Sequence, residues 1–215
     1  MKQRIAHITD VHWMEPPSIR QLPLKRILGS ANLYLFNRRA HFSEQTQRAL
    51  MQHVQRLAPD ALLFSGDLTA QATDREFKKA QHALMPVLET VPTFIVAGNH
   101  DVYTRGAHNC RRMEQYFAPW MHWQGALQIH DSPERHIIGI HASRPHLTLA
   151  SGVVPDAQLV ALKEHLSKDP APSKPLIIVM HYPILDRRGE VYDGKSHGLL
   201  NAEALIDLLR DAIRK

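Results

Sequence analysis

The chain has 215 residues, 44% of them hydrophobic and 22% charged, and a net charge of +5 when histidine is counted as neutral. These values are typical of a soluble globular protein, and no apolar run approaches the about 18 residues that a transmembrane helix needs. The basic balance favours anionic partners mildly, but the charges are dispersed and a solvated basic surface explains them more simply.

No linker or low-complexity tract divides the sequence, so we expect one domain over residues 1–215 with an insertion at about residues 14–42. The N-terminus opens directly into an apolar run without a signal segment. The single cysteine, Cys110, excludes an internal disulfide and is expected to be a packed thiol. Together these features favour a reducing, cytoplasmic location.

The first half of the chain alternates short apolar runs with amphipathic segments. Residues 5–9, 61–65 and 92–97 are predicted strands, because they are short, apolar and bounded by turn formers. One helix is predicted to start after Ser43 and another after Thr73, and Pro86 kinks or ends the second. The expected buried faces are Ala49, Leu50, Val54 and Leu57 in the first helix and Phe77, Ala80 and Leu84 in the second. This alternation implies parallel strands joined by right-handed crossovers.

Residues 14–42 interrupt this pattern with prolines, basic residues and apolar residues that are interleaved. One interpretation is a helical cover packed over the rim of the site. The other is a flap, over about residues 19–39, that contacts substrate or a membrane surface. The cover is favoured, because Pro and Gly break the apolar face.

The second half begins with three arginines, Arg105, Arg111 and Arg112, which either meet an anionic substrate or form the exposed face of a helix. Residues 127–130 and 136–140 alternate like the two strands of a hairpin. A helix is predicted from Asp156, a strand over residues 176–180, and a final amphipathic helix that covers a sheet.

Four predicted strands run directly into residues that can bind metal ions. These residues are Asp10, His12, Asp67, Asn99 and His181. Ligands of α/β sheets bind beyond the carboxyl ends of strands, so one shared site is expected. Oxygen and imidazole donors without a thiolate suit Mn²⁺, Fe²⁺ or Fe³⁺, Zn²⁺ or Mg²⁺. If Asp67 bridges two such ions, they would clamp a phosphoryl group and acidify a water to give the nucleophile.

The block Gly98-Asn99-His100-Asp101 supplies two further groups. If His100 stays off the metal, it can face the substrate and donate a proton to the leaving oxygen. Asp101 is expected to hydrogen-bond Nδ1 of His100 and fix its tautomer.

These motifs, in this order, resemble those of the calcineurin-like metallophosphoesterases. The resemblance implies a four-layer α/β/β/α sandwich in which Asp10 and His12 hold one metal, Asp67 bridges, and Asn99 and His181 hold the other. It also implies that His100 is the catalytic imidazole. Thr9-Asp10-Val11-His12 and His181-Tyr182-Pro183 look like the class III cyclic-nucleotide phosphodiesterase branch, which implies a 3′,5′-cyclic nucleotide or related diester as substrate. The lipid-A-pathway pyrophosphatases typically carry Arg at the position of His100, which argues against them.

The family's last motif, Gly-His-x-His, is missing, and His197 is not expected to replace it. We therefore expect a truncated copy of a longer protein, with an incomplete sandwich and weakened metal binding. The alternative is an inactive binding or scaffold module on the same fold. Nucleic-acid cleavage is a weaker possibility, motivated only by the basic balance.

Overall fold

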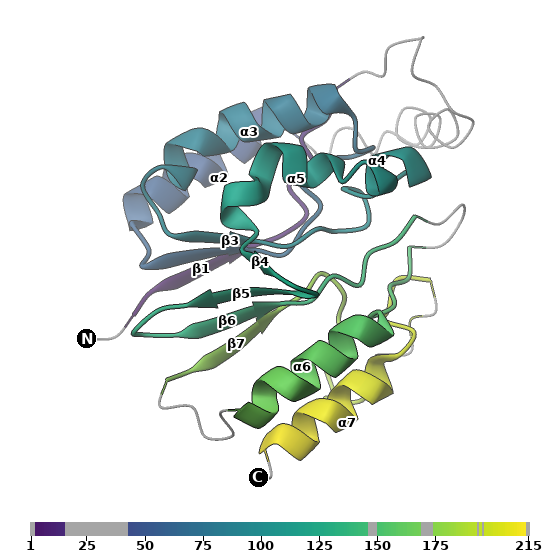
Figure 1. The fold of residues 1–215 in the computed structure, drawn as a ribbon. Coiled ribbons are helices and arrows are strands. Elements are labelled where there is room, and N and C mark those ends of the chain that lie inside the picture. Colours follow the sequence, from purple (N-terminus) through teal and green to yellow (C-terminus); the bar gives the residue numbers. More distant parts are fainter. Residues whose placement is uncertain are drawn as a thin grey trace.

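The structure is a computed structural model that describes residues 3–15, 43–145, 150–168, 174–192, 194 and 196–213. Its first sheet contains β1 (Ile5–Ile8), β2 (Ala61–Phe64) and β3 (Thr93–Ile95) in the order β1-β2-β3 (Figure 1). All three strands are parallel, as the alternation of strands and helices predicts. Each is shorter than its apolar run, because the chain turns toward the site directly after β1 and β3.

The second sheet contains β4 (Trp123–Gln124), β5 (Leu127–Asp131), β6 (His136–Gly139) and β7 (Leu176–Val179) in that order. Strands β5 and β6 form the predicted antiparallel hairpin, with Asp131 opposite His136. Strand β7 joins parallel to β6, so β7 points its carboxyl end toward the same side as the strands of the first sheet (Figure 1).

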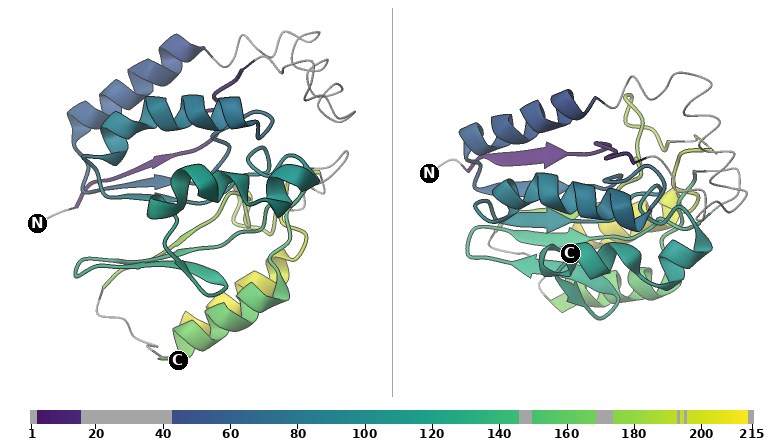
Figure 2. Two further views of the ribbon diagram at one scale, coloured as in Figure 1. Left: turned by 45° about the horizontal axis from the view of Figure 1, so that its top comes forward. Right: turned by 90° about the horizontal axis from the view of Figure 1, so that it is seen from above.

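Helices cover the outer face of each sheet. Helices α2 (Glu44–Leu57) and α3 (Asp74–Leu88) lie on the first sheet, and α5 (Arg112–Phe117) packs on α3. Helices α6 (Asp156–Lys168) and α7 (Ala202–Ile213) lie side by side on the second sheet (Figure 2). Helix α4 (Arg105–Asn109) and the short 3₁₀ helix η3 (Ala118–Trp120) flank α5.

The two sheets pack face to face through apolar side chains on their inner surfaces. This inner cluster consists of Leu63, Phe94, Val96, Ile137 and Val179. Separate buried clusters join each sheet to its own helices. The described residues therefore form helix, sheet, sheet and helix layers, which confirms the predicted α/β/β/α fold class (Figure 2).

The start of α3 agrees with its prediction. The Thr73 hydroxyl accepts from the Glu76 amide, the Glu76 carboxylate accepts from the Thr73 amide, and Phe77, Ala80 and Leu84 are fully buried. Pro86 lies inside the last turn, and the helix ends two residues later at Leu88.

Helix α2 differs from its prediction in its buried face. Ala49 is exposed, whereas Gln47 and Met51 are buried beside Val54. The face is rotated because the Gln47 side-chain amide donates to the carbonyls of Val11 and His12, at 2.7 and 3.0 Å. These two hydrogen bonds join α2 to the segment after β1. The spacing of apolar residues, on which the prediction was based, does not indicate them.

Two other expectations meet different outcomes. Cys110 is exposed at the C-terminal end of α4, so the expectation of a packed thiol is wrong, because that helix is too short to bury it.

Residues 16–42 lie outside the described residues, and the cover and flap interpretations both fall there. Within the described part of the chain, none of the helices combines the length and apolar character needed to cross a bilayer.

Candidate metal centre

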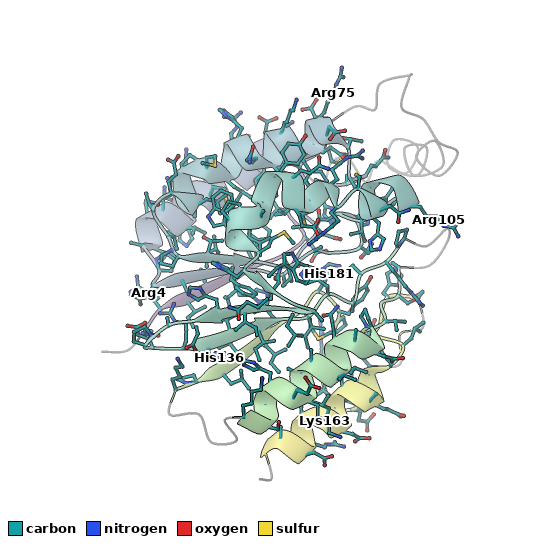
Figure 3. The ribbon with its side chains drawn as sticks, in the orientation of Figure 1. Arg4, Arg75, Arg105, His136, Lys163 and His181 are labelled. Carbon is teal, nitrogen blue, oxygen red and sulfur yellow. The ribbon has the colours of Figure 1, made fainter. Side chains whose placement is uncertain are left out.

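The residues that follow β1, β2, β3 and β7 meet at one edge of the two sheets. His181, labelled in Figure 3, comes from the second sheet, and its Nδ1 lies 2.9 Å from the carbonyl oxygen of Ser65 at the end of β2. The structure thus brings the five predicted ligand residues into a common cavity of about 440 Å³. This cavity lies beyond the carboxyl ends of the strands, where α/β sheets bind their ligands.

Three of these residues form a first group of donors. One ligand atom each from Asp10, His12 and Asp67 lie within 4.8 Å of one another. Nε2 of His12 lies 3.6 Å from Oδ1 of Asp10 and 3.6 Å from Oδ2 of Asp67. Two carboxylate oxygens and one imidazole nitrogen in this arrangement are a donor set that suits a divalent cation.

A second group lies on the other side of the Asp67 carboxylate. Nε2 of His181 is 3.0 Å from Oδ1 of Asn99 and 3.6 Å from Oδ1 of Asp67. The two oxygens of Asp67 therefore face different donor groups. A carboxylate in this position has the arrangement that a bridging ligand requires.

The two imidazoles are oriented so that Nδ1 meets a backbone carbonyl and Nε2 faces the other donor atoms of the site. Nδ1 of His12 lies 3.0 Å from the carbonyl oxygen of Thr69, and Nδ1 of His181 faces that of Ser65. Because a carbonyl only accepts, each Nδ1 carries the hydrogen, and a neutral ring presents a lone pair at Nε2. In that state the lone pairs face oxygens of Asp10, Asp67 and Asn99. Either a proton or a metal cation can lie between such nitrogen and oxygen lone pairs, and their convergence on one cavity fits a metal ion.

The backbone at the first group is held in an unusual conformation. Asp10, His12 and Asp67 have φ values of 57°, 51° and 57°. Residues other than glycine rarely adopt this left-handed backbone conformation. The amide of Asp10 donates to Gly66 and that of His12 donates to Asp67, at 3.1 and 3.0 Å. Such residues cost about 1–3 kcal/mol each and cluster at functional sites.

Two glycines allow the turns after β2 and β3 to touch. Gly66 has a φ of 101°, and a Cβ on it would overlap the backbone of Gly98. A Cβ on Gly98 would in turn overlap the amide nitrogen and Oδ1 of Asp67. The close approach of these turns brings Asn99 next to the shared carboxylate, so glycine is required at both positions.

The carboxylates give the cavity a negative potential. Partial burial opposes ionisation of Asp10, but the nearby imidazole of His12 and the Thr9 hydroxyl lower the pKa of Asp10 to about 2. Burial also opposes protonation of His12, yet Asp10 and Asp67 raise the pKa of His12 above its usual value. A site that attracts a proton this strongly attracts a metal cation for the same reason.

His100 contacts a different partner from the one that we expected. Its Nδ1 lies 2.6 Å from the carbonyl oxygen of Ala70, so the prediction that Nδ1 donates to the Asp101 carboxylate is wrong. The ring lines the cavity, stacks on Tyr103 and meets the edge of His12. Burial is the main cause that lowers the pKa of His100, which favours a neutral ring with its free lone pair at Nε2.

Asp101 instead organises the backbone beneath the site. Its carboxylate accepts hydrogen bonds from the amides of Gly98, Leu68 and Thr69, at 2.9–3.2 Å, and from the Thr69 hydroxyl. Burial, and then the charge of Asp67, raise the pKa of Asp101 to about 6. Asp101 therefore ties the turn after β3 to the turn after β2 and positions Asn99 and Asp67 indirectly.

Sequence reasoning missed two other residues that line the cavity, Tyr192 and His197. Both come from the segment between β7 and α7, whose backbone bonds to the segment before α6 through Ala150 and Gly152. His197 was considered only as a replacement for a metal ligand. No local pattern indicates that this segment folds over the site, because the hydrogen bonds that place it there join it to Ala150 and Gly152, more than forty residues away in the sequence.

The fold and the donor set define a class of protein: a two-sheet α/β/β/α sandwich with a carboxylate–imidazole metal site at the strand ends. The family model of the calcineurin-like phosphoesterases matches residues 3–210. The chain therefore belongs to the calcineurin-like phosphoesterase family.

Similar curated proteins carry several phosphoesterase names. A probable glycerophosphodiester phosphodiesterase GpdQ from Arcobacter nitrofigilis is 31% identical over 58% of this chain and 42% of its own length. The UDP-2,3-diacylglucosamine pyrophosphatase LpxG from Chlamydia trachomatis is 24% identical over 92% of this chain and 71% of its own length. A probable cyclic nucleotide phosphodiesterase from Ruthia magnifica is 29% identical over 70% of this chain and 56% of its own length. The chain thus spans about half the length of the two phosphodiesterase relatives.

A solved structure supports the fold. The crystal structure of a dimetal phosphatase from Danio rerio matches 97% of this chain and 77% of its own chain, with a TM-score of 0.58 and 15% identity. At this identity the likeness concerns the fold alone.

Proposed function

We propose that this chain holds two metal ions in the cavity at the strand ends and hydrolyses phosphodiesters. The observation that carries the proposal is the arrangement around Asp67, whose two oxygens face two separate groups of lone pairs. Membership of the calcineurin-like phosphoesterases supports the same reaction class.

Each residue has a role in this proposal. Asp10 and His12 would hold one ion, Asn99 and His181 would hold the other, and Asp67 would serve both. Ions bound there would neutralise phosphoryl charge and lower the pKa of water, so that no nucleophilic side chain is needed. The donor set suits Mn²⁺, Fe²⁺ or Fe³⁺, Zn²⁺ or Mg²⁺.

In this proposal, His100 donates a proton to the leaving group. Its Nδ1 is held by the Ala70 carbonyl, so Nε2 is the ring atom left to meet a reacting oxygen. Stacking on Tyr103 restricts the ring to one orientation. Nε2 of the neutral ring would first take up a proton from solvent and would then deliver it to the leaving oxygen. Loss of His100 would slow hydrolysis most for poor leaving groups.

The substrate that we favour is a small phosphodiester such as a 3′,5′-cyclic nucleotide. Two relatives named as phosphodiesterases support a diester, and one of them is named for cyclic nucleotides. The second candidate is a pyrophosphate bond, which the match with a pyrophosphatase over 92% of this chain supports. Both substrates present phosphoryl oxygens to the same pair of ions.

The test is a substrate panel on protein reconstituted with Mn²⁺. We would compare bis(4-nitrophenyl) phosphate, 3′,5′-cyclic AMP and a UDP-sugar pyrophosphate for the parent, His100→Ala and His53→Ala, an exposed control on α2. We expect diester turnover in the parent and the control. His100→Ala should bind metal normally and lose about 10²–10⁴-fold in rate, most on the cyclic nucleotide. Metal binding without turnover of any substrate would support the inactive binding module instead.

A further inference from the structure

A second cavity lies behind the loop that carries Asn99 and His100. Asn99 and His100 line the metal cavity, whereas the next two residues, Asp101 and Val102, line this second cavity of about 730 Å³. The loop is therefore a wall shared by both. The opposite wall comes from α4, α5, the tip of β4 and the residues between β6 and α6. A volume of this size suits a small organic molecule rather than a single ion.

One wall of the second cavity carries a cation stacked on aromatic rings. The guanidinium of Arg111 lies 5.6 Å from the centre of the Trp123 ring, and the Trp123 ring lies 4.5 Å from that of His141. Arg111 also contacts Glu114 through its Nε at 3.0 Å. Among the described residues, no hydrogen-bond partner is found for its terminal guanidinium nitrogens, so they remain available to an anion.

Two polar atoms of this wall are buried without a partner in the described structure. They are Nε1 of Trp123, a donor, and Nε2 of His141. Burial lowers the pKa of His141 to about 3, so the imidazole is neutral. A buried polar atom without a hydrogen bond costs about 1–3 kcal/mol, so a shift of the indole that lets a ligand acceptor reach Nε1 of Trp123 would remove its cost.

Arg111 stands between α4 and α5. Its φ of 48° and ψ of 50° are the left-handed conformation with which helices commonly end, and its amide donates to the carbonyl of His108 in α4. The guanidinium of a residue held in this turn lies over the Trp123 ring.

We propose that the second cavity binds a small organic anion whose carboxylate or phosphate head meets Arg111 and Trp123. Apolar side chains of Val102, Ala107 and Met113 line the same cavity and would contact the body of the molecule. The two acidic residues that line this cavity do not prevent an anion from binding, because both already have partners. Glu114 is paired with Arg111, and Asp101 is satisfied by the backbone amides that it accepts from. The N-terminal end of α6, at Pro155 and Gln158, adds a positive partial charge.

The experiment measures binding with the metal centre disabled. Isothermal titration calorimetry, on protein stripped of metal with EDTA and then dialysed free of the chelator, would compare phenyl phosphate and benzoate with phenol and inorganic phosphate. We expect phenyl phosphate or benzoate to bind and phenol to bind much more weakly. The better of the two anions identifies the preferred head group. Because the metals have been removed, a failure of the proposed hydrolysis does not affect this result.

Matched variants locate the site. Arg111→Gln should weaken binding about tenfold, as expected for the loss of a charged hydrogen-bond donor. Trp123→Phe, which keeps the ring and removes the donor, should weaken it by a smaller factor. Arg105→Gln is the control, since Arg105 is exposed on α4, points outward in Figure 3 and is not among the residues that line the cavity. The proposal is overturned if neither anion binds at millimolar concentration, or if Arg111→Gln and Arg105→Gln bind equally well.

Discussion

The two cavities on either side of the Gly98–Val102 loop differ in how their polar atoms are held. In the metal cavity, each ring of His12 and His181 is fixed at Nδ1 by a backbone carbonyl, and its other nitrogen faces oxygens. In the second cavity, Nε1 of Trp123 and Nε2 of His141 are buried without a hydrogen-bond partner among the described residues. The polar atoms of the metal cavity are thus fixed by the protein, and these two atoms of the second cavity are not.

This difference shows two ways of building a binding site. The metal cavity is rigid, because its ligands follow strands and their backbones are locked by hydrogen bonds between neighbouring turns. The second cavity is assembled from short helices and loops that the chain brings together across more than thirty residues. Changes to the turns after β1 and β2 should therefore damage the metal cavity much more than the second cavity, whereas the Gly98–Val102 loop borders both.

The largest effect is expected from Gly98→Ala. The new Cβ would overlap the backbone nitrogen and carboxylate of Asp67, so the turn must move. We expect a loss of about 3 kcal/mol in the free energy of unfolding, together with loss of metal binding. Urea denaturation and metal analysis measure the two effects. Gly106→Ala is the matched control, because a Cβ there meets nothing within 4 Å. Equal behaviour of the two variants would show that the turns are not tightly packed.

A smaller effect is expected from Asp101→Asn. The substitution places an NH₂ group or a weaker acceptor against the amides of Gly98, Leu68 and Thr69. Metal affinity should fall about 10–100-fold, as is typical when a group supporting the ligands is changed. Competition with a fluorescent chelator measures the affinity. Asp207→Asn, at an exposed position on α7, should leave it unchanged. Unchanged affinity in Asp101→Asn would mean that the ligands hold their positions without this support.

The pH dependence of stability probes the second cavity. Burial lowers the pKa of His141 to about 3 in the folded state, so the unfolded chain takes up the proton first as the pH falls below about 6.5. The contribution of His141 to the free energy of unfolding is therefore fully present above that pH and is lost progressively as the pH falls toward 3. We expect His141 to account for about 2 kcal/mol of the loss between pH 7 and pH 5.

Urea denaturation at pH 7 and at pH 5 measures this difference in the free energy of unfolding. His141→Gln should reduce the difference between them, and His53→Gln, on the exposed side of α2, should not. A difference that is the same in both variants would show that His141 is not kept neutral by its surroundings.

The smallest effect compares two helix starts. Thr73→Ala removes the hydroxyl that caps α3 and should cost about 1 kcal/mol. Ser43→Ala, at the corresponding position of α2, should cost much less, because the Ser43 side chain makes no capping hydrogen bond. Equal losses in urea denaturation would mean that capping does not distinguish the two helices.

Features governed by local chemistry were predictable from the sequence. The hairpin at residues 127–140, the capping box at Thr73 and the layered fold all follow from periodicity and turn residues. The meeting of Asp10, Asp67 and His181 was expected because parallel strands end at one edge.

Features that depend on contacts between distant segments were not predictable. Nδ1 of His100 donates a hydrogen bond to the carbonyl oxygen of Ala70, thirty residues away in the sequence, and no motif indicates that contact. Gln47 rotates the buried face of α2 through bonds to the segment after β1. The second cavity joins Arg111, Trp123 and His141 across two layers of the fold, so its three residues carry no common sequence signal.

The most direct test of the account is the metal content of the parent and of Asp67→Asn after reconstitution with Mn²⁺ and removal of excess metal. If the two oxygens of Asp67 serve two donor groups, the parent should retain two ions per chain and the variant should lose that paired occupancy. Asp60→Asn, outside the cavity, should behave like the parent. A variant Asp67→Asn that binds two ions as tightly as the parent would contradict the account.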